Sequence, residues 1–489
     1  MYHVKNLLSS ASVVAALILT LQVGCSKTQS GDLPITTSSE DARAAYLEGR
    51  HLAENLRAND ARVHFQKAVE ADPAFAMAYL QSAIIAPSPG EVFEYLDQAV
   101  ERSGGVSKAE QQYIEAVNIR TRGDSKGALR LLRTLARTYP EDSRISLLIG
   151  LYEYVDLADE DEGAKWLKRS VASQTDYAPP LNMLGYLYLG QRNFDEAENY
   201  FKQQIDILPE EPNPHDSMGD MLSRAGRYEE AVNSYARAVE LDPGFVLSQR
   251  NIGINLAWSG NYDAGRDAIM QAMDMAPTSA GKIAAQYAIA RLYMYQNELA
   301  EALVASRKAI TMSQAANLPA SVANYEMMSA RIYMRMDNPE QAAEAIAHCA
   351  KTIADAQLDE SVTKNWWRQR LYEEADLASR AADFDLADAK TAALRELIDI
   401  EKNPGLMRLY HSAMGKVEIQ RENYQSAVDH LLQANMNSPY DTYYLSRAYA
   451  GAGNIENAQE LLERAVKWNA DSQFYSLIRA EAAAALKGS

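Results

Sequence analysis

Apolar residues recur at steps of three and four through almost the whole chain beyond residue 41, in runs of about a dozen residues. This spacing puts the apolar side chains on one face of an α-helix, so each run predicts an amphipathic helix. The runs come in pairs, joined by short links of turn residues such as Gly190–Asn193, Ala225–Arg227 and Gly260–Asn261. The pattern therefore predicts an all-α chain of helix–turn–helix units.

The pairs repeat every 34 residues, most clearly in the consecutive windows Ala178–Glu211, Pro212–Phe245 and Val246–Ser279. Matching offsets carry a small residue in the first helix, a small and a large apolar residue in the second helix, and a closing proline. These sets are Gly185, Ala197, Phe201 and Pro209; Gly219, Ala231, Tyr235 and Pro243; and Gly253, Gly265, Ile269 and Pro277. About eleven units fit between Asp41 and Ser472.

The residue types at these offsets predict how the units pack. Small residues let neighbouring helices approach closely, and the large apolar residues fill the space between units. Each proline lacks the N–H that would continue a helix, so it ends the second helix before the next unit begins. No unit can bury its apolar face alone, so stacked units share one continuous core.

This pattern resembles the tetratricopeptide repeat, and the resemblance covers nearly the whole chain beyond residue 41. It implies an all-α, right-handed superhelical solenoid whose concave groove is lined by the first helix of each unit. It also implies that this groove binds a protein or a peptide. The residues beyond Asp471 predict one more amphipathic helix, at 474–489, which caps the exposed end of the stack.

The repeats define the expected organisation. Residues 41–354 form the first part of the array, 355–405 a degenerate repeat, and 406–473 the last repeats. The first helix of the degenerate repeat is expected to begin near Trp366 and Trp367, and a bend or boundary is plausible there. Those two tryptophans form either a second binding surface or part of the packing between helices.

The N-terminus predicts export rather than fold. Residues 1–24 combine Lys5, an uncharged apolar stretch from Leu7 to Leu21, and a small residue before Cys25, as in a secretory signal peptide. The Gly-Cys ending resembles the lipobox of bacterial lipoproteins, which implies lipidation of Cys25, although Gln22 stands where that family has an aliphatic residue. An uncleaved inner-membrane anchor and simple secretion are the alternatives.

Polar residues follow Cys25 without periodicity, so 25–40 is expected to be the lipidated cysteine and a flexible tether. Ser26 stands where an aspartate would resemble an inner-membrane retention signal. The expected location is therefore the cell envelope, lipid-anchored and facing the periplasm, with the outer membrane favoured.

Charge narrows the class of partner. The formal net charge is −18, and a surface this acidic repels phosphate backbones, so we expect no nucleic-acid binding. Two cysteines are too few for a disulfide framework.

No motif predicts catalysis, a metal or a cofactor. The histidines form no HExxH pair and no zinc spacing, and Cys349 beside His348 is interpreted as a small core residue with a surface neighbour. Gly123–Leu129 superficially suggests a phosphate loop, and Asp156–Gly163 a calcium loop, but both fit better as turns between helices. The sequence therefore predicts that this protein is not an enzyme.

Residues at two positions of each first helix, four apart, point towards the predicted groove. In several units they form Tyr–Arg pairs, and tyrosine and arginine are enriched at binding hot spots. The predicted groove residues are Tyr186, Asp220, Arg250, Tyr287, Arg291, Tyr295, Met327, Arg331, Arg335, Tyr443 and Arg447, with Tyr46 and Arg50 in the first unit. The alternative is that these pairs only stabilise an exposed helix face.

The sequence as a whole predicts an envelope-anchored scaffold or adaptor that binds partner proteins or peptides. A periplasmic sensor of a peptide or small ligand, signalling through a partner, is the alternative. An enzyme of an unrecognised type is the third reading.

Overall fold

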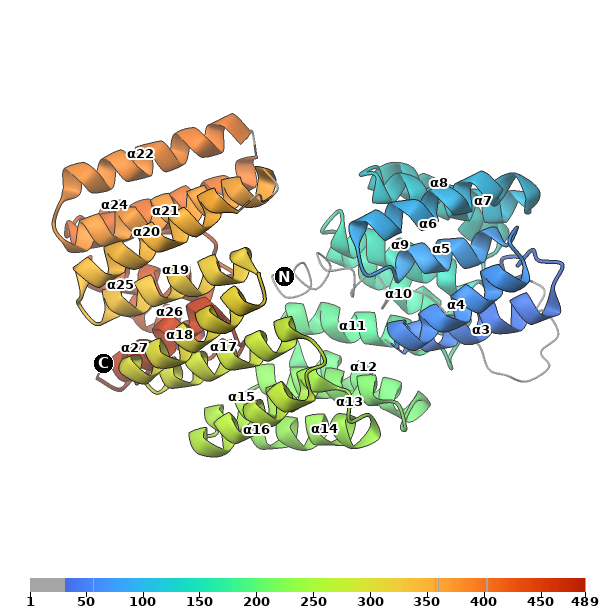
Figure 1. Ribbon diagram of the computed structural model, residues 1–489, viewed down its shortest axis with the longest axis horizontal. Helices are drawn as coiled ribbons and strands as arrows, with labels where there is room; N and C mark the ends of the chain where they lie inside the picture. The colour runs from blue at the N-terminus through green and yellow to red at the C-terminus, as the bar shows by residue number, and fades with distance from the viewer. Residues whose placement is uncertain (1–30, 56, 357, 359, 402, 489) are drawn as a thin grey trace. The chain divides into compact units, whose positions relative to one another are not determined.

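A computed structural model of the protein describes residues 31–488, except 56, 357, 359 and 402. The structure is 80% helical, with 25 α-helices and no strand among the described residues (Figure 1), so the all-α prediction is confirmed. The predicted signal peptide and Cys25 lie outside the described residues, and both stay predictions.

The chain forms two compact units, which meet at Met221 and Leu222 inside helix α13. Unit 1 contains α3 Glu40–Glu54, α4 Ala58–Ala71, α5 Ala76–Ile84, α6 Pro89–Arg102, α7 Lys108–Thr121, α8 Ser125–Thr138, α9 Ser143–Val155, α10 Glu160–Ser173, α11 Ala178–Gly190, α12 Phe194–Ile207 and most of α13 Pro212–Arg224. A short 3₁₀ turn, η2 Ser103–Gly105, follows α6.

Unit 2 contains α14 Tyr228–Leu241, α15 Val246–Trp258, α16 Tyr262–Met275, α17 Ser279–Tyr295, α18 Leu299–Ala315, α19 Pro319–Arg335, α20 Pro339–Asp355, α21 Glu360–Arg380, α22 Phe384–Glu401, η3 Pro404–Leu406, α23 Met407–Gln420, α24 Tyr424–Leu431, α25 Pro439–Gly451, α26 Ile455–Val466 and α27 Gln473–Gly488. The stretch 355–405 holds the pair α21–α22 and lies inside this unit.

Helices α3 to α26 form twelve consecutive pairs in the described part of the chain, one more than the eleven expected. Residues 355–405, expected to be a degenerate repeat, contribute the complete pair α21–α22. From α7 onward, the turn inside each pair, including the three predicted turns, contains one residue at positive φ that ends the first helix. These residues are Gly123, Ala158, Arg192, Gly226, Gly260, Asn297, Asp337, Ala382, Glu422 and Gly453.

Both loops that superficially suggested ligand sites are such turns. Gly123 has φ +103°, and the side chain of Asp124 caps α8 by accepting the backbone N–H of Gly127. Asp159 caps α10 in the same way, one residue after Ala158. The acidic side chains at these positions are explained by helix capping.

Small residues bring the two helices of each pair together, as the repeat pattern predicts. A methyl group added at Gly253 of α15 would lie 2.5 Å from the backbone oxygen of Gly265 in α16, and one at Gly185 would lie 2.4 Å from the ring of Phe201. Neither position has room for a side chain. The repeat is longer between α17 and α20, where each helix has 17 residues and the 34-residue period weakens.

The close approach at Gly253 yields a stability prediction. Gly253→Ala should lower the free energy of unfolding by about 1–3 kcal/mol, because the new methyl group overlaps the backbone of α16. Gly90→Ala in α6 is the matched control: nothing lies within 4 Å of its added methyl group, so the change should be neutral or slightly stabilising. Denaturant unfolding measures both, and equal effects of the two substitutions would contradict the packing argument.

Candidate functional site

An extended stretch of chain, residues 32–37 (the N-terminal segment), lies on the first helices of unit 1. The backbone N–H of Leu33 donates to the carboxylate of Asp142, which caps α9, at 2.8 Å. Thr36 donates its N–H and its hydroxyl to Glu110 of α7, at 2.7 and 2.5 Å. Arg43 of α3 donates to the carbonyl of Ile35 at 2.9 Å. Residues 32–37 therefore make specific contacts with the folded repeats.

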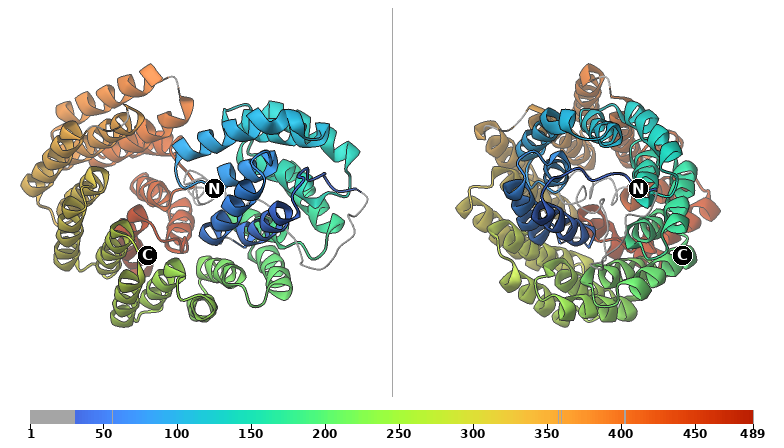
Figure 2. Two further views of the ribbon diagram at one scale, coloured as in Figure 1. Left: turned by 45° about the vertical axis from the view of Figure 1, so that its right-hand side comes forward. Right: turned by 90° about the vertical axis from the view of Figure 1, so that its right-hand side faces the viewer.

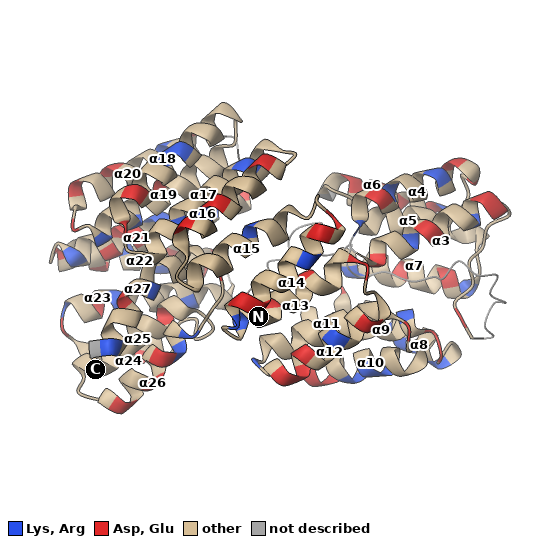
Figure 3. Ribbon diagram, turned by 90° about the horizontal axis from the view of Figure 1, so that it is seen from below, with Lys and Arg blue, Asp and Glu red and all other residues tan. Residues whose placement is uncertain are grey.

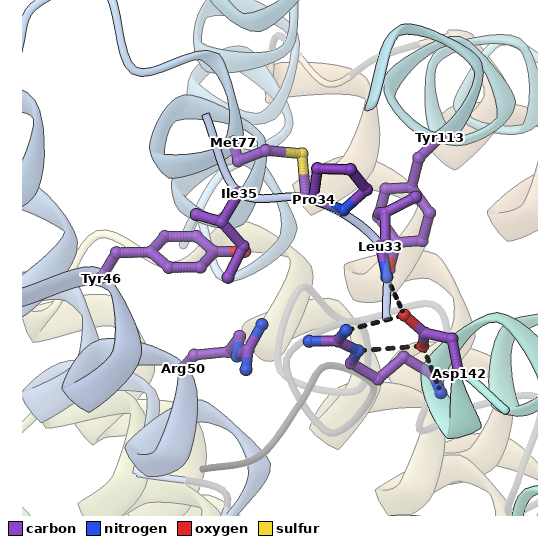
Figure 4. A pocket seen from close by; sticks show the side chains of 9 residues that line it. Leu33, Pro34, Ile35, Tyr46, Arg50, Met77, Tyr113 and Asp142 are labelled. Atoms are coloured by element: carbon purple, nitrogen blue, oxygen red, sulfur yellow. Dashed lines mark hydrogen bonds and ion pairs between the residues drawn. The ribbon is translucent and has the colours of Figure 1, made fainter. Parts of the chain in front are cut away.

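A small pocket remains beneath this segment (Figure 4). Leu33, Pro34 and Ile35 line one side, and the first helices and the α9 cap contribute Tyr46, Arg50, Met77, Tyr113, Asp142 and Arg144. We call this first-helix surface the inner face of unit 1. The predicted residues Tyr46 and Arg50 both lie on it, and both are buried.

Asp142 is the centre of the charged contacts in this pocket. Its carboxylate accepts two hydrogen bonds from the guanidinium of Arg144, at 2.9 and 2.7 Å. Burial alone would raise the pKa of Asp142, but Arg144 and the N–H of Leu33 outweigh it and hold that pKa below its ordinary value. Asp142 therefore stays ionised, and the N-terminal segment binds to a carboxylate that is already paired.

The same face buries polar atoms for which no hydrogen-bond partner is present in the described structure. They include one carboxylate oxygen of Glu54, both polar side-chain atoms of Gln81, and the hydroxyls of Tyr113 and Tyr177. Burial raises the pKa of Glu54 well above its ordinary value, although the charge of Arg50 opposes it. An unsatisfied buried polar group costs about 1–3 kcal/mol, so such a cluster is typical of a surface that meets a polar ligand.

In unit 2 the predicted groove residues contact the chain's own C-terminus. Arg291 of α17 donates two hydrogen bonds to Asp471, at 3.0 and 2.5 Å, and the hydroxyl of Tyr295 adds a third at 2.8 Å. Arg335 of α19 donates to the carbonyl of Leu477 and forms an ion pair with Glu481 at 3.0 Å. The predicted groove residues on α17 and α19 therefore do bind a segment, and that segment is the C-terminus of the same chain.

Helix α27 occupies the inner face of unit 2, which we define as the surface of its first helices. It packs on α26, as expected of a cap, but also on α17, α19 and α25. Figure 2 shows the dark red C-terminal helix enclosed by the curve of the preceding pairs of this unit. Tyr443 of α25, another predicted groove residue, donates its hydroxyl to Glu481 at 3.2 Å.

A cationic side chain of α27 lies among aromatic rings. The guanidinium carbon of Arg479 lies 5.2 Å from the ring centre of Trp258 and 5.7 Å from that of Tyr295. Tyr475 of α27 is fully buried and packs edge-on against the same two rings. Cation–π contacts of this kind supply about 0.5–2 kcal/mol each when desolvated.

The remaining predicted residues of unit 2 have different roles. Arg331 pairs with Glu373 of α21 at 2.7 Å, and its guanidinium also lies 4.7 Å from the ring centre of Phe474 in α27. The ring of Tyr287 packs against Tyr325, and Arg291 lies over it.

Three predicted residues bear on the C-terminal contact weakly or not at all. Arg250 is half-buried. Burial would raise the pKa of Asp471, but the charge of Arg291 and, to a smaller extent, that of Arg250 lower it. Met327 packs into the helix–helix core with Cys349 and Ile353. Arg447 is exposed and lies over the ring of Tyr444.

Tyr186 and Asp220 lie on the first helices of successive repeats, and they contact each other within unit 1. The hydroxyl of Tyr186 donates to the carboxylate of Asp220 at 3.0 Å. Burial, followed by the charge of Asp220, raises the pKa of Tyr186 well above its ordinary value, so the phenol stays protonated and acts as a donor.

The sequence pattern did not reveal a charged network at α21, α23 and α25. Lys416 of α23 is buried and pairs with Asp376 of α21 at 2.5 Å. Its ammonium group also makes cation–π contacts with three tyrosine rings, at 4.9–5.2 Å from the ring centres of Tyr372, Tyr440 and Tyr444. Arg380 pairs with the same aspartate at 3.1 Å. Because Asp376 and Lys416 lie 40 residues apart on different repeats, no local spacing marks them. The lysine is fully engaged, which favours a structural role.

Side chains with catalytic potential are few in the described residues. Burial raises the pKa of Cys349 to about 12, so the thiol is a poor nucleophile, while His348 beside it is exposed. His411 and His430 share a contact of 3.0 Å between their Nδ1 atoms. In the part of the chain that the structure describes, no three His, Cys, Asp or Glu side chains gather to hold a metal.

The tryptophan pair on α21 is only partly exposed. Trp366 and Trp367 are half-buried against the core of Cys349 and Ile353, which favours packing over a binding surface. Acidic residues are spread along the helices of each unit (Figure 3). Among helices within the described ranges, none combines the length and apolarity needed to span a bilayer.

Sequence models of the tetratricopeptide repeat match residues 178–210, 215–247 and 443–472. The first two matches coincide with the windows in which the 34-residue pattern is clearest. The chain therefore contains tetratricopeptide repeats, as predicted. No curated protein matches it in a sequence comparison.

Solved repeat proteins show limited similarity. A tetratricopeptide repeat protein from Parabacteroides merdae is 16% identical over 54% of this chain and 98% of its own, with a TM-score of 0.41. MamA from Desulfovibrio magneticus is 16% identical over 35% of this chain and 96% of its own (TM-score 0.32), and YrrB, described as having an unusual peptide-binding site, is 17% identical over 44% and 92% (TM-score 0.29). At these scores the similarities carry no argument about function.

The fold and the repeats define an all-α solenoid of a class that serves as protein-interaction scaffolds. Partners of this class are proteins or peptides. The surfaces that such a protein offers are its inner faces, and in both units those faces hold a terminal segment of the same chain.

Asp441 makes the stability of unit 2 depend on pH. This carboxyl group is buried at the start of α25; burial raises its pKa from 3.8 to about 6, although a hydrogen bond from Ser412 opposes the shift. Because the folded pKa lies above the unfolded one, the stabilising contribution is complete below about pH 4 and is lost as pH rises through 6. Asp441→Asn should therefore stabilise the protein at pH 8 by about 1–3 kcal/mol relative to its effect at pH 5.

Denaturant unfolding of wild type and variant at the two pH values measures this difference. Asp385→Asn, on the exposed first turn of α22, is the matched control and should have the same effect at both. A pH-independent effect of Asp441→Asn would show that its carboxyl group does not titrate differently in the folded state.

Proposed function

We propose that this protein is an envelope-tethered scaffold that binds an extended segment of a partner protein on the inner face of unit 1. The observation that supports this proposal is the N-terminal segment itself. Residues 32–37 lie across successive first helices as an extended peptide would, held through backbone as well as side-chain groups.

The contacts indicate what this face recognises. Asp142 and Glu110 accept backbone N–H groups, and Glu110 and Asp72 accept the hydroxyls of Thr36 and Thr37. Leu33 is buried against the first helices. A partner segment that fits would be extended, would present one apolar side chain, and would carry hydroxyl residues three and four positions later.

Such a partner segment would have to displace the N-terminal segment from the inner face of unit 1. The N-terminal segment is tethered to the face that it covers, so it competes at an effective concentration of order mM. The unsatisfied polar atoms of Glu54, Gln81, Tyr113 and Tyr177 lie on the same unit and offer further hydrogen bonds to a ligand larger than six residues.

The anchor proposal places unit 1 close to a membrane. Cys25 and Leu33 are eight residues apart in sequence, which span at most about 29 Å when fully extended. With Cys25 lipidated and Leu33 bound to Asp142, the inner face of unit 1 would stay within that distance of the lipid surface. Release of the N-terminal segment would lengthen the tether to the start of α3.

Crosslinking tests the binding proposal. A photoreactive residue in place of Arg43, which contacts the N-terminal segment, should crosslink the full-length protein to a partner in its native envelope. A synthetic peptide of residues 31–38, present at about ten times the effective concentration of the tethered segment, should reduce that product about tenfold, because it competes for the same face. Val63 of α4, which is 54% exposed, is the control position. Products that arise equally from Val63, or that ignore the peptide, would contradict the proposal.

Detergent partitioning tests the anchor. Wild-type protein should enter the detergent phase of a Triton X-114 separation, and Cys25→Ser should move to the aqueous phase, because acyl chains each contribute about 0.8 kcal/mol per buried CH₂. Ser26→Ala is the matched control and should partition like wild type. A Cys25→Ser variant that remains in the detergent phase would instead indicate an uncleaved membrane anchor.

A further inference from the structure

The C-terminal segment, residues 469–481, contacts unit 2 in the manner of a bound ligand. Its contacts include Arg291 and Tyr295 with Asp471, Arg335 with Glu481, and Tyr443 with Glu481. Its side chains Tyr475, Leu477, Ile478 and Ala482 join the apolar core of unit 2. Carboxylates near both ends of the segment add charged contacts with the inner face.

The side chains of α27 that meet the inner face follow a helix-in-groove pattern. Phe474, Leu477, Ile478 and Glu481 occupy positions i, i+3, i+4 and i+7 of one helix face, and Leu477 and Ile478 are buried. The ring of Phe474 lies between Arg331 of α19 and Tyr440 of α25. This spacing is the one by which amphipathic helices insert their anchors into grooves on other proteins.

The inner face of unit 2 is basic on an acidic protein. Arg291 and Arg335 pair with Asp471 and Glu481, which stand ten residues apart, and Arg250 adds to the positive field at Asp471. The whole chain carries a formal charge of −18. Charge complementarity therefore selects a helix that presents carboxylates at these two positions.

The repeats of unit 2 are built without α27. The two helices of a pair pack on each other through small residues, as at Gly253 against Gly265 and Gly415 against Leu431. Successive pairs pack through the second helix of one and the first helix of the next, as α16 does on α17 and α18 on α19. Helix α27 follows α26 by the short link 467–472 and is not part of any pair. In a repeat array, each unit depends on its neighbours, so a helix lying across several units can be exchanged while their interfaces persist.

We infer that the inner face of unit 2 is a second binding surface, specific for an amphipathic helix of a partner protein that carries two carboxylates ten residues apart, and that the C-terminal segment is its resident intramolecular ligand. The partner helix carries a carboxylate just before its first turn, an aromatic anchor three residues later, and a second carboxylate ten residues after the first. This surface is separate from the inner face of unit 1, so either can fail without the other.

Binding of the segment in trans tests this inference. The probe is a fluorescein-labelled peptide of residues 469–488, measured by anisotropy against the full-length protein. In wild type the tethered helix competes at an effective concentration of order mM, so the probe should bind weakly. In Asp471→Asn/Glu481→Gln the resident helix loses its ion pairs while the arginines remain, and the probe should bind at least about tenfold more tightly.

Two further variants locate the effect. Glu456→Gln/Glu460→Gln makes the same change of charge on the exposed surface of α26 and should bind the probe as wild type does. Adding Arg291→Glu to the double variant should abolish the gain, because that residue holds the carboxylate at the start of the segment. A folded double variant without tighter binding, or a gain that survives Arg291→Glu, would overturn the inference.

A second measurement needs no variant, in case the double substitution prevents folding. The same peptide with a photoreactive group at Phe474, added in excess to wild-type protein, should crosslink to α19 or α25, which hold that side chain in the intramolecular complex. Crosslinks confined to other helices would overturn the inference. A dimer of the double variant that the peptide dissociates would assign the face to a second copy of the chain, and would equally contradict a partner helix.

Discussion

The structure depends on the close approach of helices at positions that admit no side chain. Gly253 and Gly265 bring the backbones of α15 and α16 close together, and the ring of Phe201 packs directly on the backbone at Gly185. An isolated pair leaves one apolar face open to water, so burial is completed only when the next pair stacks on it. Most apolar side chains are buried in these interfaces between helices. What remains for the first-helix surfaces is a mixture of tyrosine, arginine and carboxylate, and this mixture gives the inner faces their chemistry.

Buried charges on those faces must be paired, because an isolated charge away from water costs several kcal/mol. The chain satisfies this requirement partly with itself. Asp142 and Arg144 pair beneath Leu33 in unit 1, and Arg291 pairs with Asp471 in unit 2. Lys416 and Asp376 show the same principle in the network between α21 and α23. The terminal segments thus lie where the repeats leave polar groups in need of partners.

If the protein is a scaffold as proposed, a partner would bind by displacing the terminal segment that covers the inner face. An extended segment of the chain occupies one inner face and a helix the other. Under the two proposals above, the faces would therefore select ligands of different conformation. A tethered segment competes strongly, which sets a threshold of affinity for any partner and favours partners whose contacts match those of the resident segment. The acidic surface of the repeats adds a second filter, since it repels acidic partners except where arginines line an inner face.

The sequence by itself determined the repeats: prolines 34 residues apart, small residues at fixed offsets and turn residues between helices are local signals, and the helices follow them. It also marked Arg291, Tyr295, Arg335 and Tyr443 as facing a groove, because a four-residue step defines a helix face. Only the tertiary structure decided what they contact. Asp471 lies 180 residues from Arg291, and Asp142 lies 109 residues from Leu33. Such pairings arise when stacking brings distant repeats and termini together, and no local periodicity encodes them.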